Sequence, residues 1–128
     1  MKIFNKSEGW GSKVNFVDEN NILLGYDLAQ HCCEYADWFI SDKPETGIRQ
    51  DLTGSGFDEE MPDWIFDTKY FKETSGSEFH SGGMAIFRIV NKVTNEEKFI
   101  HIFNSHNGYY SHGFEFKSEN EIFQEASL

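Results

Sequence analysis

The chain has 128 residues, a length that suits one domain, because two domains would each have too little chain for a normal core. Its 22 acidic and 11 basic residues give a formal charge of −11. Binding along nucleic-acid phosphates needs clustered lysine and arginine, and an anionic membrane surface also favours basic proteins, so the composition argues against both partners. Aromatic residues make up 16% of the chain, which argues against a disordered protein.

Two features bear on the cellular compartment. No apolar run approaches the ~20 residues of a membrane span, and the beginning of the chain contains no apolar signal core. The two cysteines, Cys32 and Cys33, are adjacent, where a disulfide would close a strained ring. A small secreted domain is expected to carry several cysteine pairs. We therefore expect reduced thiols and a cytoplasmic protein.

The first half of the chain contains one clear hairpin. Apolar residues alternate on both sides of a turn at residues 18–21, so residues 12–25 are predicted to form two antiparallel strands. Residues 27–40 fit either a helix face or a strand, and we favour the strand because hairpin neighbours dominate the chain. Residues 41–60 are expected to be a loop with at most one short strand.

The second half begins with a strand, a turn and a second, more apolar strand. Residues 64–71 are predicted to form the first strand, and residues 74–83, which are rich in glycine and serine, form a long turn. Residues 84–90 are apolar at nearly every position, which is typical of a central strand covered on both faces. Its charged member, Arg88, then needs an acidic partner or a sheet edge.

The strongest turn signal lies at residues 107–108, where Asn-Gly is the preferred dipeptide of a type I′ hairpin. The apolar stretches 99–103 and 112–116 flank this turn, so we predict that they pair across it. In that register, one face of the hairpin carries phenylalanines together with His101 and His112. Such a face could line a pocket for a small molecule.

Together these elements predict a mainly β protein with about seven short strands. We expect a single antiparallel meander, curled into a half-barrel or a small sandwich, with at most one or two short helices. An α+β fold is the alternative, because residues 27–40 also fit a helix. The chain 1–128 is expected to be a single domain in which residues 118–128 form a short acidic tail.

Three short segments follow one another in an order found in a known family. Residues 31–34 read His-Cys-Cys-Glu, residues 52–54 read Leu-Thr-Gly, and residues 107–116 read Asn-Gly-Tyr-Tyr-Ser-His-Gly-Phe-Glu-Phe. Together they resemble a family of small bacterial and phage proteins classed as a domain of unknown function, although Ser111 stands where the family has glycine. The resemblance covers residues 14–117. It implies a fold and a bacterial or phage origin, but no reaction and no catalytic residue.

Candidate metal ligands and nucleophiles are few. Histidine and cysteine are typical zinc ligands, which makes His31, Cys32 and Cys33 weak candidates. The chain lacks Cys-x-x-Cys and His-x-x-x-His spacings, and a cysteine buried as a small apolar residue explains the pair equally well. We therefore expect no metal and no other cofactor. A Cys33 thiolate activated by His101 or His112 is the catalytic alternative, but no familiar protease signature accompanies it.

An acidic run occupies residues 58–60. It lacks the ligand register of a calcium-binding EF-hand loop, and the usual fate of such a run is a solvated face. Alternatively, the run presents negative charge to a basic partner, whose approach a net charge of −11 would accelerate. The aromatic residues expected to reach the surface are Trp10, Trp38, Trp64, Tyr109 and Tyr110. Trp10 lies between two glycines, and Tyr109 and Tyr110 follow the tight turn, so these three are the aromatic candidates for an interface.

The sequence contains no complete catalytic motif, which argues against an enzyme. We predict a small acidic binding or accessory protein that docks on a protein with a basic surface, while its oligomeric state stays open. The alternatives are a small-molecule-binding protein or enzyme that uses the histidine and aromatic pocket, and a protein that self-associates through a sheet edge. The candidate binding residues are Trp10, Asp58, Glu59, Glu60, His101, Tyr109, Tyr110 and His112.

Overall fold

In the residues that the computed structural model describes, eleven β-strands and two single-turn 3-10 helices make up the regular structure. The structure describes residues 1–8, 11–29, 34–54, 58–106, 108 and 111–128. The prediction of a mainly β protein is confirmed. Of the two predicted shapes, a half-barrel and a small sandwich, the structure shows the sandwich. Within the described ranges, no helix is long and apolar enough to cross a membrane.

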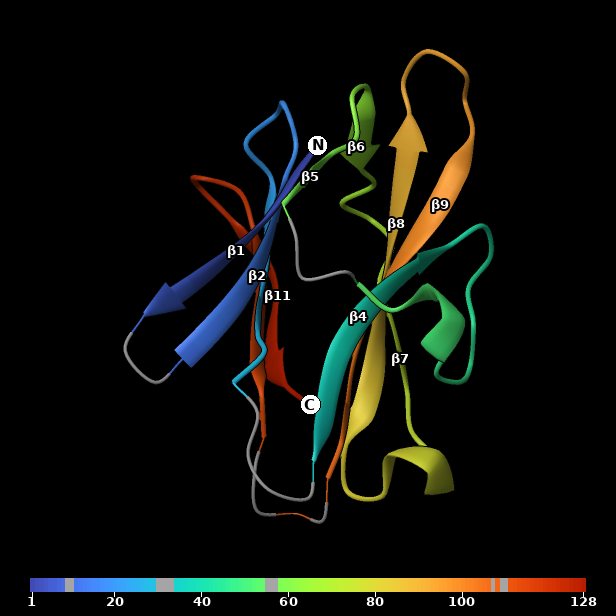
Figure 1. Cartoon of the computed structure of the whole chain (residues 1–128). Coiled ribbons are helices and arrows are strands. Elements are labelled where there is room, and N and C mark those ends of the chain that lie inside the picture. The colour runs from blue at the N-terminus through green and yellow to red at the C-terminus, as the bar shows by residue number, and fades with distance from the viewer. Residues whose placement is uncertain (9–10, 30–33, 55–57, 107, 109–110) are drawn as a thin grey trace.

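The strands form two antiparallel sheets (Figure 1). Sheet A has six strands in the order β11-β10-β3-β2-β1-β5, and sheet B has the order β4-β9-β8-β6, with β7 also pairing with β8. The strands of sheet A are β1 (Lys2–Glu8), β2 (Gly11–Val17), β3 (Leu23–Asp27), β5 (Glu59–Glu60), β10 (Gly113–Lys117) and β11 (Ile122–Ser127). Those of sheet B are β4 (Tyr35–Ser41), β6 (Trp64–Phe66), β7 (Lys72–Thr74), β8 (Gly83–Asn91) and β9 (Glu97–Ser105).

The main hydrophobic core lies between the two sheets. Alternate residues of a strand point to opposite faces, so the inner face of sheet A is built from every second residue of its strands. The aromatic rings of Phe16 and Trp38 meet edge to face across the layers, with their centroids 5.1 Å apart. The core residues of sheet A are Ile3, Val14, Phe16, Leu24, Tyr26, Phe114 and Phe116. Polar residues occupy much of the opposite face of this sheet.

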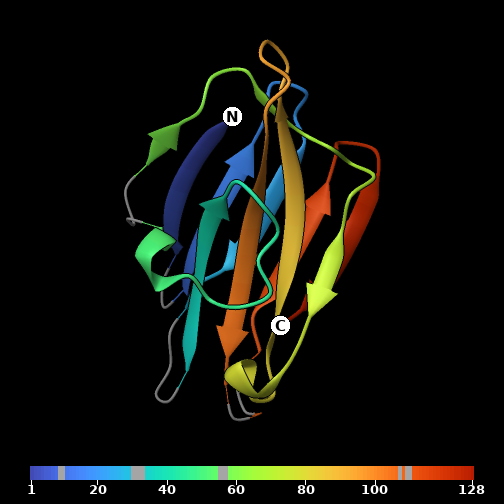
Figure 2. The same cartoon turned by 90° about the vertical axis from the view of Figure 1, so that its right-hand side faces the viewer.

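Sheet B is buried on both faces because its central strands are apolar on both faces. Along β8, Ala85 and Phe87 face the main core, while Met84 and Ile86 belong to a second core on the outer side. Figure 2 shows the segment that follows β4 crossing this outer face on its way to η1 (Gln50–Leu52). Phe79, at the end of η2 (Ser77–Phe79), is buried in the same second core.

Several predictions of local structure are confirmed. Strands β2 and β3 form the expected hairpin, with Val17 opposite Leu23. The central strand predicted at residues 84–90 is β8, and its Arg88 binds the carboxylates of Asp67 and Glu97 at 3.0 and 2.7 Å. Residues 35–41 form strand β4, as favoured, rather than a helix.

The predicted hairpin around residues 107–108 is wrong. Strand β9 pairs with β4 and β8 in sheet B, whereas β10 pairs with β3 and β11 in sheet A. The backbone of Gly108 does have the expected positive φ, at 101°. The expectation for Gly108 is therefore met, and Asn107 lies outside the described residues. Alternation of apolar residues, however, does not tell which sheet a strand joins. Consequently, Phe99 and Phe116, which the predicted register places opposite one another, lie in separate cores.

Two further expectations need correction. The strand predicted at residues 64–71 ends at Phe66, because Asp67 turns the chain and accepts hydrogen bonds from following backbone N–H groups. The acidic tail contains a strand, since residues 122–127 form β11 and its Phe123 packs against Phe116 at a ring distance of 5.3 Å.

A buried carboxylate joins the two sheets at the end of the sandwich where β2 turns into β3. Asp18 Oδ1 accepts the backbone N–H groups of Asn20 and Ile22, both at 2.9 Å, and closes the turn. Its Oδ2 accepts the N–H of Phe66, in β6 of the opposite sheet, at 2.9 Å. One side chain therefore holds a turn of sheet A to an edge of sheet B.

We expect Asp18→Asn to lower the free energy of unfolding by about 1–3 kcal/mol, although the two side chains are nearly the same size. An amide presents one oxygen and one NH₂ group, so at least one of the buried backbone donors would face another donor. Urea unfolding measures the change. Asp42→Asn is the matched control, because the Asp42 side chain is 90% exposed. Equal stability of the two variants would contradict this role for Asp18.

Candidate functional site

The acidic run predicted to bind a partner lies on the edge of sheet A. We define the acidic strip as Asp58, Glu59 and Glu60, all of which are exposed. Glu59 and Glu60 form β5, which pairs with Ile3 and Lys2 of β1. Asp58 Oδ1 accepts the backbone N–H of Asn5 at 3.0 Å, which holds the beginning of the strip against the same strand.

A hollow of about 430 Å³ opens beside the acidic strip. Its lining combines three carboxylates with the ammonium group of Lys2 and the half-buried ring of Phe4. The hollow therefore offers both negative charge and an aromatic surface to whatever lies against this edge. The residues that line it are Lys2, Ile3, Phe4, Asp58, Glu59 and Glu60.

A second polar centre is buried at the opposite end of the sandwich from Asp18. His112 precedes β10, and its ring contacts β3 and the residue before β4. Its Nδ1 lies 2.6 Å from the main-chain oxygen of Asp27, and its Nε2 lies 3.0 Å from Glu34 Oε1. The side chains of His112 and Glu34 are 1% and 0% exposed. In addition, the backbone of His112 exchanges two hydrogen bonds with Leu128.

The partners of His112 determine where its protons lie. A main-chain oxygen only accepts hydrogen bonds, so Nδ1 carries a proton and donates it to Asp27. The contact between Nε2 and Glu34 Oε1 pairs this imidazole with a buried carboxyl group. The pair links sheet A to sheet B through a buried polar contact.

Tyr26 completes this centre from the inner face of sheet A. Its ring lies 6.1 Å from that of His112, and its hydroxyl donates a hydrogen bond to the main-chain oxygen of Phe103 at 2.7 Å. Burial raises the pKa of the Tyr26 hydroxyl, and the nearby carboxylates of Asp27 and Glu34 raise this pKa further. The hydroxyl therefore stays protonated and acts as a donor between the sheets.

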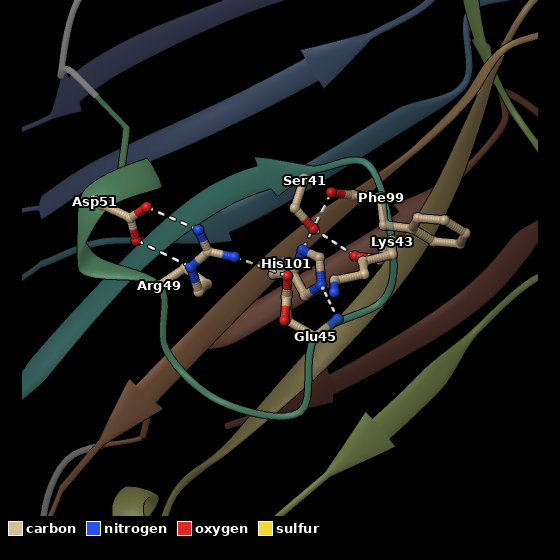
Figure 3. A network of polar contacts seen from close by, with 7 residues as sticks. All are labelled: Ser41, Lys43, Glu45, Arg49, Asp51, Phe99 and His101. Carbon is tan, nitrogen blue, oxygen red and sulfur yellow. Dashed lines mark hydrogen bonds and ion pairs between the residues drawn. The ribbon is translucent and has the colours of Figure 1, made fainter.

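His101 lies in the second core, on the other face of sheet B. Its imidazole stacks on Phe39 with ring centroids 4.2 Å apart and an interplanar angle of 8°. Figure 3 shows the ring beneath the loop that follows β4, where its Nε2 accepts the backbone N–H of Glu45 at 2.9 Å. Its Nδ1 lies 3.1 Å from the main-chain oxygen of Phe99 and donates to it. This set of partners requires a neutral ring.

The same loop is fixed by charges on its surface. Arg49 binds Glu45 at 3.0 Å and Asp51 at 2.8 Å, and Ser41 Oγ donates to the main-chain oxygen of Lys43 (Figure 3). Because Glu45 also donates its N–H to His101, the ion pairs and the buried imidazole hold one loop over the second core.

The structure separates the two histidines that the sequence placed in one pocket. His101 is buried in the second core and His112 is buried between the sheets, so they do not line a shared pocket. The expectation that Trp38 and Trp64 reach the surface is wrong, because both side chains are buried in the main core. Trp10, Tyr109 and Tyr110, together with the weak metal candidates His31, Cys32 and Cys33, lie outside the described residues. Among the residues that the structure describes, no group of three or more His, Cys, Asp or Glu side chains could hold a metal ion.

Sequence reasoning missed the residues that join the sheets. Glu34 and Tyr26 gave no signal, because their partners lie far along the chain. Asp18 stood within a recognisable turn, where an aspartate often accepts local N–H groups, but its bond to Phe66 was not foreseeable.

Comparisons with protein-family models, with curated proteins and with solved structures find no match to this chain. The family resemblance therefore stays a prediction.

We expect His101→Phe to flatten the loss of stability in acid. Burial lowers the pKa of His101 from 6.5 to about 4. As the pH falls, this residue therefore gains a proton in the unfolded chain at a higher pH than in the folded protein. The stability linked to this histidine is present above pH 6.5 and is lost as the pH falls toward 4. Between neutral pH and a pH near the folded pKa, the fall in unfolding free energy should shrink by about 2 kcal/mol.

Urea unfolding at both pH values measures this difference. His80→Asn is the control, because His80 is exposed and has a φ of 55°, which asparagine tolerates. If His101→Phe lost as much unfolding free energy in acid as the wild-type protein, His101 would not be held neutral by the fold.

We also expect Glu34→Ala to destabilise the protein by about 2–4 kcal/mol, because it removes the buried partner of His112. Glu34→Gln retains an oxygen and an N–H near His112 and should cost at least about 1 kcal/mol less. Thermal or urea unfolding of both variants gives the comparison. Equal costs in the two variants would mean that the contact with His112 Nε2 contributes nothing.

Proposed function

We propose that this protein is a non-catalytic binding or accessory protein, of bacterial or phage origin, that docks on a protein with a basic surface. The proposed docking surface is the acidic strip at the edge of sheet A. The observation that carries the proposal is the hollow of about 430 Å³ beside the strip, whose lining includes the half-buried Phe4 and the three acidic residues of the strip. Interfaces commonly combine an aromatic anchor with charged residues at the rim.

Charged residues on an edge strand also have a purely structural use. Natural sheets protect their edges with short strands and with charges, and β5 has both features. Edge protection, however, does not require a hollow or an aromatic ring beside the charges. The geometry around Lys2 and Phe4 therefore favours a surface that receives side chains of a partner.

The net charge supports the choice of a basic partner. A formal charge of −11 attracts positively charged proteins over several ångströms and raises the rate of encounter. The attraction is screened by salt, so a partner bound in this way dissociates more readily as ionic strength rises. Nucleic acid and anionic membranes carry the same sign of charge as the protein and are repelled.

The experiment compares two variants of equal charge. Glu59→Gln with Glu60→Gln removes two charges from the acidic strip, and Glu73→Gln with Glu96→Gln removes two exposed charges from sheet B and its β8–β9 turn. Each variant is used to capture proteins from a bacterial lysate, and the captured protein is then purified for titration. We expect the strip variant to raise the Kd by about fivefold at low salt, while the sheet B variant changes it little.

High salt should reduce the difference between the two variants. The absence of any captured basic protein, or an equal Kd for the two variants at low salt, would refute docking through the acidic strip.

A further inference from the structure

The lateral edges of the two sheets are not equally protected. Strand β5 has only two residues, and β6 and β7, which pair with successive parts of β8, have three each. Strand β4 is longer, but the following loop covers its edge, since Thr53 bridges Phe39 and the Gly54 N–H donates to Trp38 O at 2.8 Å. Short or covered edges of this kind are poor templates for additional strands.

Strand β11 has neither form of protection. It has six residues, stands at the end of sheet A and, among the described residues, pairs with β10 alone. Successive residues of a strand direct their N–H and C=O groups to opposite sides. Apart from the register shift at Phe123, alternate residues of β11 therefore present these groups to solvent, in the geometry that a further strand would need.

The side chains along β11 also suit a bound segment. Ile122 begins the strand and is 60% exposed; Val93, in the β8–β9 turn, is the other large hydrophobic residue exposed in the described part of the chain. At the far end of the strand, Ser127 and Leu128 line a hollow of about 360 Å³ together with residues of β7 and β8. An added strand would thus meet an apolar side chain at one end and a hollow at the other.

The charges around β11 indicate the chemistry of that segment. Glu119, Glu121 and Glu125 are exposed on the strand or on the turn before it, and Glu73 lines the hollow beside Ser127. Lys117, the nearest cation in β10, is paired with Glu115 at 3.3 Å. A segment that carries lysine or arginine is therefore complementary to this edge. A second copy of the chain, with its own charge of −11, is repelled.

We propose that β11 binds an extended, lysine- or arginine-containing peptide segment of another protein, which adds to sheet A as a further strand. Main-chain hydrogen bonds supply the affinity. Contacts with Ile122, the flanking glutamates and the terminal hollow determine which peptide sequences bind best. The site lies at the opposite edge of sheet A from the acidic strip and does not depend on it.

Hydrogen exchange with a defined probe tests the proposal. The probe is an eight-residue peptide in which lysine alternates with valine and threonine, and its control has glutamate in place of lysine. We expect the lysine peptide to slow exchange at alternate amides of residues 122–127, by at least about tenfold, and to leave β5 unchanged. Binding without this protection, or no binding at all, would overturn the proposal.

Proline substitutions at neighbouring positions give a second test. Gln124 and Glu125 direct their N–H groups to opposite sides, so one of the two faces solvent and the other bonds to β10. Of Gln124→Pro and Glu125→Pro, the variant that removes the outward N–H should melt like the parent protein and bind the lysine peptide at least about tenfold more weakly. Unchanged binding by that folded variant would contradict strand addition.

Three further outcomes are decisive. Glu121→Gln with Glu125→Gln should weaken lysine-peptide binding severalfold, whereas Glu59→Gln with Glu60→Gln, which removes the same number of charges at the opposite edge of sheet A, should weaken it less. Protection of β11 that appears without peptide and grows with protein concentration, together with a dimer in sedimentation, would replace the peptide by a second copy. Tight binding of the glutamate peptide would reject the electrostatic argument.

Discussion

The burial of β8 and β9 on both faces is the constraint on which the rest of the structure depends. Strands with apolar residues at successive positions must be covered on two sides. Sheet A covers one side, and the loop held by Glu45 and His101, together with Phe79, covers the other. Sheet B consequently has little free surface. The outer face and the edges of sheet A are left to contact solvent or partners.

Buried polar groups then fix how the two sheets meet. Asp18 binds Phe66 at one end of the sandwich, and His112 binds Glu34 at the other. Apolar contacts between sheets favour burial but tolerate sliding, whereas a buried hydrogen bond is costly to leave unpaired and therefore selects one arrangement. A frame of this kind keeps the edges of sheet A in fixed positions, as the proposed docking requires.

Local features were predictable from sequence, and long-range ones were not. The central position of β8 and the need of Arg88 for a partner or a sheet edge followed from the run of residues in that strand alone. The partner of β9 did not, because alternation of residues such as Phe99 and Phe103 fits a hairpin and a sandwich crossover equally well. For the acidic strip, the sequence indicated the charge but not the hollow beside Phe4. The bonds of Glu34 and Asp18 depend on residues more than forty positions away, for which one sequence contains no signal.

Native-state hydrogen exchange with residue resolution tests the central claim most directly. If β8 and β9 form the doubly covered centre, their amides should exchange only through global unfolding, with a free energy equal to that from urea unfolding. Amides of β11 and β5, at the edges of sheet A, should exchange through smaller openings. Exchange of β8 or β9 by local opening, while sheet A stays protected, would contradict the account.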